Sequence, residues 1–290
     1  MQPDPFDRQI FSVIDEKCRE LEDKLKSDVV FYHGSIYPHY FRSFRDFIED
    51  VKSKSQRTED TISLVLRTGG GSAETTERMV GVLRKHYGQV NFIVPDVAMS
   101  AGTILCMSGD RIYMDYASTL GPIDPQVPTP DTGDYVPALG YIDKVLEITN
   151  KGQLAPADVV MLKSLDLAKL ALFEQARDLS VDLLKKWLVQ YKFRNWTQHR
   201  TTNPGTPVTE QEKADRAEQI AKDLADHKRW RSHGRSLDVA KLKELKIEID
   251  DYSDIPDLST TIRSYNDLLT GCIDRMRVDF VMHSIHTPLN

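Results

Sequence analysis

The chain has 290 residues and carries 38 Lys and Arg against 44 Asp and Glu, a net charge of −6. Proteins dedicated to nucleic-acid binding usually carry a basic excess, so this balance argues against a nucleic-acid partner. No stretch approaches the roughly 18 consecutive apolar residues of a membrane span, and the first residues lack the features of a secretory signal. The three cysteines are far apart and indicate neither a disulfide framework nor a metal site. We therefore expect a cytoplasmic, water-soluble protein.

The first half of the chain alternates amphipathic helices with short β-rich runs. Apolar residues at spacings of three and four predict helices over residues 6–26, 40–53 and 73–86. Strands are predicted over residues 28–32, 62–66, 90–94 and 111–114, with a short apolar helix after residue 102. This alternation is typical of βαβ units around a mostly parallel sheet, and it places the chain in the α/β class.

The second half is predicted to be mainly helical. Residues 121–137 are rich in Pro, Asp and Thr, and we expect a long loop without regular structure. Helices are predicted over residues 140–149, 156–190, 209–226, 237–244 and 259–285, and one strand over 247–249. The chain divides into an N-terminal helix (1–27), an α/β domain with a helical second half (28–250) and a C-terminal helical tail (251–290).

Ser100 stands between a predicted strand and an apolar helix, and the small residues Ala101 and Gly102 follow it. A hydroxyl in this position lies at the positive end of a helix, and the amide of Ala101 points to where an oxyanion would form. The alternative is that Ser100 only caps the helix, as most serines at such junctions do. The pattern indicates either a nucleophile or a cap.

A run of three glycines, Gly69 to Gly71, follows the preceding strand. Glycines permit positive φ and bring backbone N–H groups close to a ligand. The run matches neither the phosphate-binding loop nor the dinucleotide pattern, so a nucleotide site is not indicated here, and a flexible turn is the simpler alternative. Because neighbouring parallel strands end in this loop and in the Ser100 turn, amides from both can converge on one oxyanion.

Four motifs recur in order over about sixty residues: Thr68-Gly-Gly-Gly-Ser-Ala73, Val94-Pro-Asp-Val-Ala-Met-Ser-Ala-Gly-Thr103, Ser108-Gly-Asp-Arg-Ile112 and Leu120-Gly-Pro-Ile-Asp-Pro-Gln126. Together they resemble the ClpP/crotonase superfamily, and within it the serine dehydrogenase proteinases related to signal peptide peptidase A. The resemblance covers residues 28–250. It implies a spiral of ββα units and a serine peptidase that acts on polypeptides without a cofactor, metal or nucleotide. Relatives assemble into rings or stacked trimers, so a homo-oligomer is implied as well.

The resemblance also assigns site residues. Ser100 matches the nucleophile of the family, and the amides of Gly70, Gly71 and Ala101 match its oxyanion hole. ClpP has a histidine about 25 residues after its serine, where this chain reads Ile123 to Gln126, so the Ser-His-Asp triad is not supported. The signal peptide peptidase branch instead takes a lysine from a helix further along the chain.

Lys144, 44 residues after Ser100, matches that lysine. A lysine acts as a general base only if desolvation lowers its pKa toward neutrality. Its neighbours Ile142, Val145 and Leu146 can supply an apolar wall, whereas most helix lysines are solvated. Three other residues stay open: Lys151 and His233 as alternative bases, and Asp124 either as a group that orients the base or as part of a rigid turn.

Three other functions remain compatible with the sequence. A crotonase-type acyl-CoA enzyme uses the same fold and oxyanion amides without a serine nucleophile, so Ser100 discriminates against it. The fold can also serve as a catalytically inactive scaffold or binding module. Finally, Ala98-Met-Ser-Ala-Gly102 approximates the nucleophile elbow of an α/β-hydrolase, although the upstream glycine loop fits the peptidase branch better.

Overall fold

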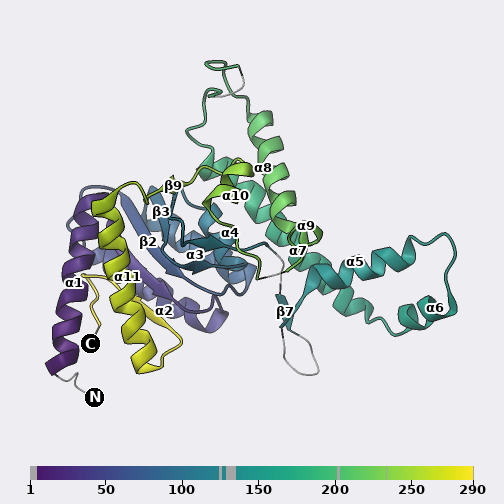
Figure 1. Ribbon diagram of the computed structural model, residues 1–290, viewed down its shortest axis with the longest axis horizontal. Coiled ribbons are helices and arrows are strands. Elements are labelled where there is room, and N and C mark those ends of the chain that lie inside the picture. The colour runs from purple at the N-terminus through teal and green to yellow at the C-terminus, as the bar shows by residue number, and fades with distance from the viewer. Residues whose placement is uncertain (1–4, 124–125, 129–134, 201–202, 233, 290) are drawn as a thin grey trace.

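The computed structural model describes residues 5–123, 126–128, 135–200, 203–232 and 234–289. Its main sheet has six strands in the order β10-β1-β2-β3-β5-β9 (Figure 1). The strands are β1 (Asp28–His33), β2 (Thr61–Arg67), β3 (Gln89–Val94), β5 (Arg111–Met114), β9 (Asp250–Asp251) and β10 (Val281–His283). All neighbours are parallel except β10, which runs antiparallel to β1. The predicted α/β class is confirmed.

Both faces of the sheet are covered, because successive side chains of a strand point to opposite faces. Val30 and Tyr32 of β1 belong to a core shared with α2 (Pro38–Lys54), α3 (Ala73–His86), α4 (Ala101–Met107) and α7 (Leu167–Trp187). Val29 and Phe31 face the opposite core, formed with α1 (Pro5–Leu25) and α11 (Pro256–Met276). Figure 1 shows α1 and α11 side by side over that face.

The C-terminal segment contributes to the sheet as well as to the helices. The tail helix predicted over 259–285 is wrong beyond Met276, because Arg277 adopts a left-handed conformation (φ 54°) that ends α11. The chain then returns as β10, whose His283 pairs with Phe31 of β1. The domain boundaries at 27 and 250 stay a prediction; α1, α11 and β10 share one core with the sheet.

Three other expectations for the second half need correction. Residues 121–137 contain a short antiparallel hairpin of β7 (Gln126–Pro128) and β8 (Tyr135–Pro137). The helix predicted over 156–190 is divided into α6 (Pro156–Lys163) and α7, because Asp166 caps α7 by accepting hydrogen bonds from the amides of Ala168 and Lys169. The strand predicted over 247–249 begins only at Asp250.

Helix α5 (Ala138–Thr149), α6 and the first turns of α7 project from the rest of the molecule in Figure 1, and residues 138–172 are called the arm below. Helix α5 packs on α7 through Tyr141 of the arm and Phe173 just beyond it, whose rings meet edge to face at 5.1 Å. Beyond the arm lie a π-helical turn (Leu188–Lys192), α8 (Glu210–Ala225), α9 (His227–Trp230) and α10 (Val239–Glu244). No helix in the described part of the chain has both the length and the apolar character to cross a membrane.

Candidate active site

Ser100 occupies a strained turn between the short strand β4 (Val97–Ala98), which pairs with β6 (Thr119–Leu120), and α4. Its φ of 50° and ψ of −113° are disfavoured for a residue with a side chain, and such strain persists only where the surrounding structure holds it. The side chain is 4% exposed and makes no capping hydrogen bond to α4. The capping alternative therefore does not hold, and the hydroxyl forms no hydrogen bond with the residues that the structure describes.

The glycine loop runs directly against this turn. Thr68 forms a parallel bridge with Ala98: its amide donates to the Val97 carbonyl, and its carbonyl accepts from the Met99 amide, both at 3.0 Å. A Cβ atom on Gly70 would lie 2.9 Å from the Cβ of Ser100, too close for a real contact. The predicted meeting of the glycine loop and the serine turn is thus present in the structure.

Two backbone amides beside the turn donate no hydrogen bond to any described residue. The amide of Gly70 donates to the hydroxyl of Thr68 at 3.0 Å, so this donor is engaged within the loop. Ile36 lies beside Gly71 (φ 149°), donating its amide to the carbonyl of Gly70 and accepting the amide of Ser72. The amide of Gly71 takes no part in either hydrogen bond. Within the described residues, neither the Gly71 amide nor the Ala101 amide donates a hydrogen bond, as expected for Ala101 in the first turn of a helix.

Side-chain contacts behind Ser100 fix the turn in place. The hydroxyl of Thr103 lies 2.9 Å from the carbonyls of Ala98 and Gly121 and accepts the Gly121 amide at 3.0 Å. A Cβ atom on Gly102 would lie 2.5 Å from the Cγ2 atom of Thr68, so only glycine allows α4 to approach the loop this closely. Both contacts position the turn rather than the substrate.

The candidate base is not in the environment that the sequence predicts. Lys144 lies on α5, where its amine is 3.2 Å from the carboxylate of Glu147 and its side chain is 54% exposed. Ile142 is buried against Phe173, but Leu146 is 46% exposed. The expected apolar wall around Lys144 is therefore not formed in this conformation of the chain.

Of the other three candidates for the base or its orienting group, the structure describes only Lys151. Lys151 forms an ion pair with Asp158 at 2.7 Å, and its side chain is 41% exposed. Asp124 and His233 lie outside the described residues.

Beside the glycine loop lies a cavity of about 510 Å³, lined by Thr68, Gly69 and Val97 together with His33 and Tyr37. Burial lowers the pKa of His33, and the guanidinium of Arg67, 3.2 Å from its Nδ1, lowers it further. The sequence analysis missed this histidine. The signal was available, since His33 ends β1 at the same edge of the parallel sheet as the glycine loop that follows β2.

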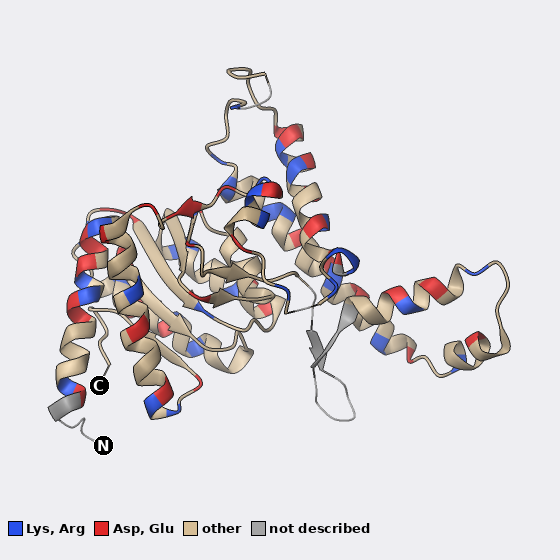
Figure 2. Cartoon of the chain, viewed as in Figure 1, with Lys and Arg blue, Asp and Glu red and all other residues tan. Residues whose placement is uncertain are grey.

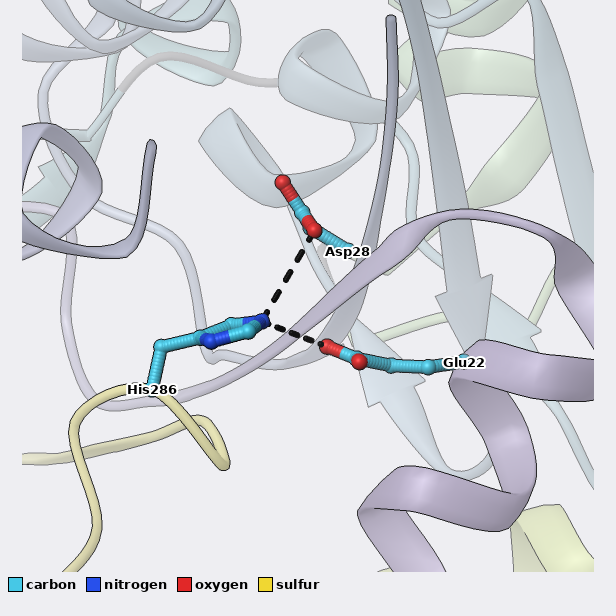
Figure 3. Close-up of side chains that lie close together, drawn as sticks. All are labelled: Glu22, Asp28 and His286. Carbon is cyan, nitrogen blue, oxygen red and sulfur yellow. Dashed lines mark ion pairs between the residues drawn. The ribbon is translucent and has the colours of Figure 1, made fainter. Parts of the chain in front are cut away.

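One cluster elsewhere has the composition of a metal site (Figure 3). The Nε2 atom of His286 lies 3.4 Å from a Glu22 carboxylate oxygen and 3.8 Å from one of Asp28. The two carboxylates already accept hydrogen bonds, for example from the Val29 amide at 3.1 Å and the Tyr87 hydroxyl at 2.8 Å. Burial raises the pKa of Glu22, despite the Val29 hydrogen bond and the nearby His286. This arrangement fits an ion pair that fastens the C-terminal segment to α1 and β1.

Comparison with known proteins identifies the family. Residues 48–209, more than half of the chain, match the family described as ClpP-like SDH-type serine proteinase. The chain belongs to this family. The matched region contains the glycine loop, Ser100 and Lys144, and it ends before His233.

Two curated relatives of this chain are uncharacterized proteins of Methanocaldococcus jannaschii. The first, MJ1495, is 29% identical over 72% of this chain and 59% of its own length. The second, MJ0137, is 27% identical over 80% of this chain and 71% of its own length. The chain thus spans less than two thirds of the first relative.

Among solved structures, two variants of the 1510-N membrane-bound stomatin-specific protease are similar. A lysine-to-alanine variant in complex with a substrate peptide has a TM-score of 0.45 and 18% identity, over 76% of this chain and 73% of that one. A serine-to-alanine variant has a TM-score of 0.44 and 16% identity, over 79% and 82%.

Proposed function

We propose that this chain is a cytoplasmic endopeptidase that cleaves polypeptides through an acyl-enzyme formed on Ser100. The observation that carries the proposal is a strained, buried serine whose side chain does not cap α4 and which lies in close contact with the glycine loop. Membership of a serine proteinase family supports it. In this reaction the Ser100 oxygen attacks the peptide carbonyl, the amine leaves with a proton, and water then releases the acyl group.

The negative oxygen of the tetrahedral intermediate is stabilised by backbone amides in this proposal. Among the described residues, the amides of Ala101 and Gly71 have no other hydrogen bond, which supports their role as donors. The Gly70 amide contributes only if it releases the Thr68 hydroxyl. No metal ion or cofactor has a part in these steps.

Lys144 is the proposed base, and its exposure sets a condition on that role. An ammonium in contact with Glu147 and solvent is a poor base, because desolvation is what lowers a lysine pKa toward neutrality. We propose that the arm moves, or is covered by a second chain, when the site becomes competent. Lys144 would then exchange Glu147 for the hydroxyl of Ser100.

Substituting Lys144 by Ala is expected to lower the acylation rate by about 10²-fold or more, the usual contribution of a general base. Stability should hardly change, since the side chain is exposed and exposed ion pairs contribute little. The measurement is the rate of labelling by a fluorophosphonate over pH 6 to 9, beside thermal unfolding.

Lys163→Ala, at an exposed position of α6 on the arm, is the matched control and should label at the wild-type rate. If Lys144→Ala is labelled at the wild-type rate, Lys144 is not the general base and another group has that role. Loss of labelling in Lys151→Ala, His33→Ala or His233→Ala would then identify it.

We propose further that copies of the chain associate through the arm. Most large exposed apolar side chains of the described residues lie there: Leu146, Leu154, Val159, Val160, Met161, Leu167 and Leu172. A concentration of apolar surface of this kind marks an interaction site. A second copy that covers it would also remove solvent from the region of Lys144.

Placing glutamates at Val160 and Leu167, which are 68% and 73% exposed, is expected to convert an oligomer into a monomer. A buried charge without a partner opposes association, whereas the same charge is tolerated in the isolated chain. Light scattering gives the mass of each form. Val278→Glu, at an exposed position after α11, is the control and should leave the mass unchanged. A monomeric wild type, or an unchanged mass for the double variant, would refute the proposal.

A further inference from the structure

A second and larger cavity lies away from Ser100. It has a volume of about 730 Å³, is open to solvent on one side, and is lined by residues from 192–200, one face of α8 and residues from 243–248. This volume is within the range of sites for small molecules, roughly 300 to 1,000 Å³. Its lysine Lys192 interacts with Asp110 and Arg111 at the start of β5, whereas Ser100 follows the end of the parallel neighbour β3. The two sites therefore lie at opposite edges of the sheet.

Positive charge predominates in the lining of this cavity. Its basic side chains are Lys192, Arg200, Arg216, Lys243 and Lys246. Arg200 pairs with Glu248 at 2.9 Å, and Lys243 lies 3.7 Å from Asp251. Within the described parts of the chain, the other three basic side chains form no ion pair.

The acidic residues of the lining are already engaged. Glu212 accepts hydrogen bonds from Thr209 at the start of α8 and pairs with His199 at 3.1 Å. Asp215 accepts the side-chain amide of Gln211 at 2.8 Å. Lys192, Arg216 and Lys246 are thus the lining cations that form no ion pair within the described residues, although Asp250 and Glu248 are near enough to attract the charge of Lys192. Figure 2 shows charges of both signs along α8, so the excess belongs to the cavity and not to the whole helix.

Lys192 lies in a position where a bound anion would stabilise its positive charge. It ends the π-helical turn that follows α7, and such turns frequently occur at functional sites. Burial lowers the pKa of Lys192 to about 8, although Asp250 and Glu248 attract its charge. A half-buried ammonium that lacks an ion pair gains more from a bound anion than a solvated one does.

An indole of fixed orientation completes the lining. The ring of Trp196 meets Phe193 at 5.5 Å and 67° and His199 at 5.8 Å and 83°, both edge to face. These contacts set the plane of a half-buried ring that lines the cavity. A flat aromatic face beside unpaired cations suits a ligand that has a planar ring and an anionic group.

We propose that this cavity binds a phosphorylated ligand with a planar ring, the chemistry of a nucleotide. Lys192, Arg216 and Lys246 hold the phosphate groups, and Trp196 stacks on the ring. This differs from the glycine loop beside Ser100, where the sequence offers no nucleotide motif. Binding here needs no hydrolysis of the ligand and does not depend on the peptidase proposal.

The test is a calorimetric titration of the full chain with ADP, adenosine and inorganic phosphate. We expect ADP to bind most tightly, with an affinity that falls at least tenfold in Arg216→Ala and in Lys192→Met. The methionine keeps the apolar stem of the half-buried lysine, so the fold should be retained. Quenching of tryptophan fluorescence by ADP should be lost in Trp196→Phe, since Trp187 and Trp230 are buried.

Lys222→Ala on the same helix is the matched control, because this exposed lysine pairs with Glu218 at 2.8 Å and does not line the cavity. It should bind ADP as the wild type does. Several results would overturn the proposal: no binding of ADP at millimolar concentration, an equal loss in Lys222→Ala, phosphate alone binding as tightly as ADP, or an acidic peptide binding in preference to it. Peptidase activity is measured separately, so failure here leaves the Ser100 proposal untouched.

Discussion

Ser100→Ala is expected to abolish labelling by a fluorophosphonate and to lower peptide hydrolysis by roughly 10⁴-fold or more, as removal of a serine nucleophile does. The hydroxyl is buried, does not cap α4 and lies against the glycine loop. Mass spectrometry of the labelled wild type should locate the adduct on the peptide that contains Ser100.

Ser108→Ala supplies the matched control. Ser108 is also buried and lies at the other end of α4, where its hydroxyl donates to the Leu105 carbonyl at 2.7 Å. This variant should keep its label. Labelling that persists in Ser100→Ala would refute the assignment. A folded wild type that takes no label would favour the inactive scaffold, and binding of a CoA thioester would favour the crotonase-type enzyme.

The strained backbone at Ser100 can be tested by comparing the stability of two variants. Its φ of 50° strains any residue with a Cβ atom, so Ser100→Ala keeps the strain and Ser100→Gly relieves it. We expect the glycine variant to be more stable than the alanine variant by about 1 kcal/mol or more, and equally inactive. Equal unfolding temperatures would mean that the turn is not strained.

The first half of the fold could be predicted because its signals are local. Apolar residues at helical spacing gave α3 at its observed bounds, and the β-rich run at Arg111 gave β5. Ser100 and the glycine run were found the same way, since a nucleophile turn and a glycine loop are properties of a few consecutive residues. Their contact followed from the rule that parallel strands end at one edge of the sheet.

Features that depend on contacts between distant segments could not be predicted. The three residues of β10 carry too little pattern to indicate a strand; their conformation comes from pairing with β1. The hairpin of β7 and β8 contains Pro128 and Pro137, which argue against regular structure in a sequence. The helix that carries Lys144 was predicted, but the exposure of its amine depends on how the arm packs.

Gly70→Ala is expected to lower kcat by about 10²- to 10³-fold, the effect of losing one oxyanion donor. The added Cβ atom would lie 2.8 Å from the Met99 carbonyl oxygen and 2.9 Å from the Cβ of Ser100, and the φ of 105° disfavours any side chain. Because the loop and the serine turn cannot both keep their positions, the amides and the nucleophile lose their alignment. The measurements are kcat, KM and the affinity of a peptide boronate, whose adduct with serine is tetrahedral.

Gly81→Ala separates this effect from a general change in stability. A Cβ atom there meets nothing within 4 Å, and Gly81 lies within α3, where alanine is favoured over glycine by about 1 kcal/mol. That variant should be at least as stable as the wild type and fully active. If Gly70→Ala keeps both kcat and boronate affinity while it remains folded, the glycine loop has no part in the oxyanion hole. If boronate affinity falls while KM holds, the loop acts on the tetrahedral state rather than on the bound substrate, as donors to an oxyanion must.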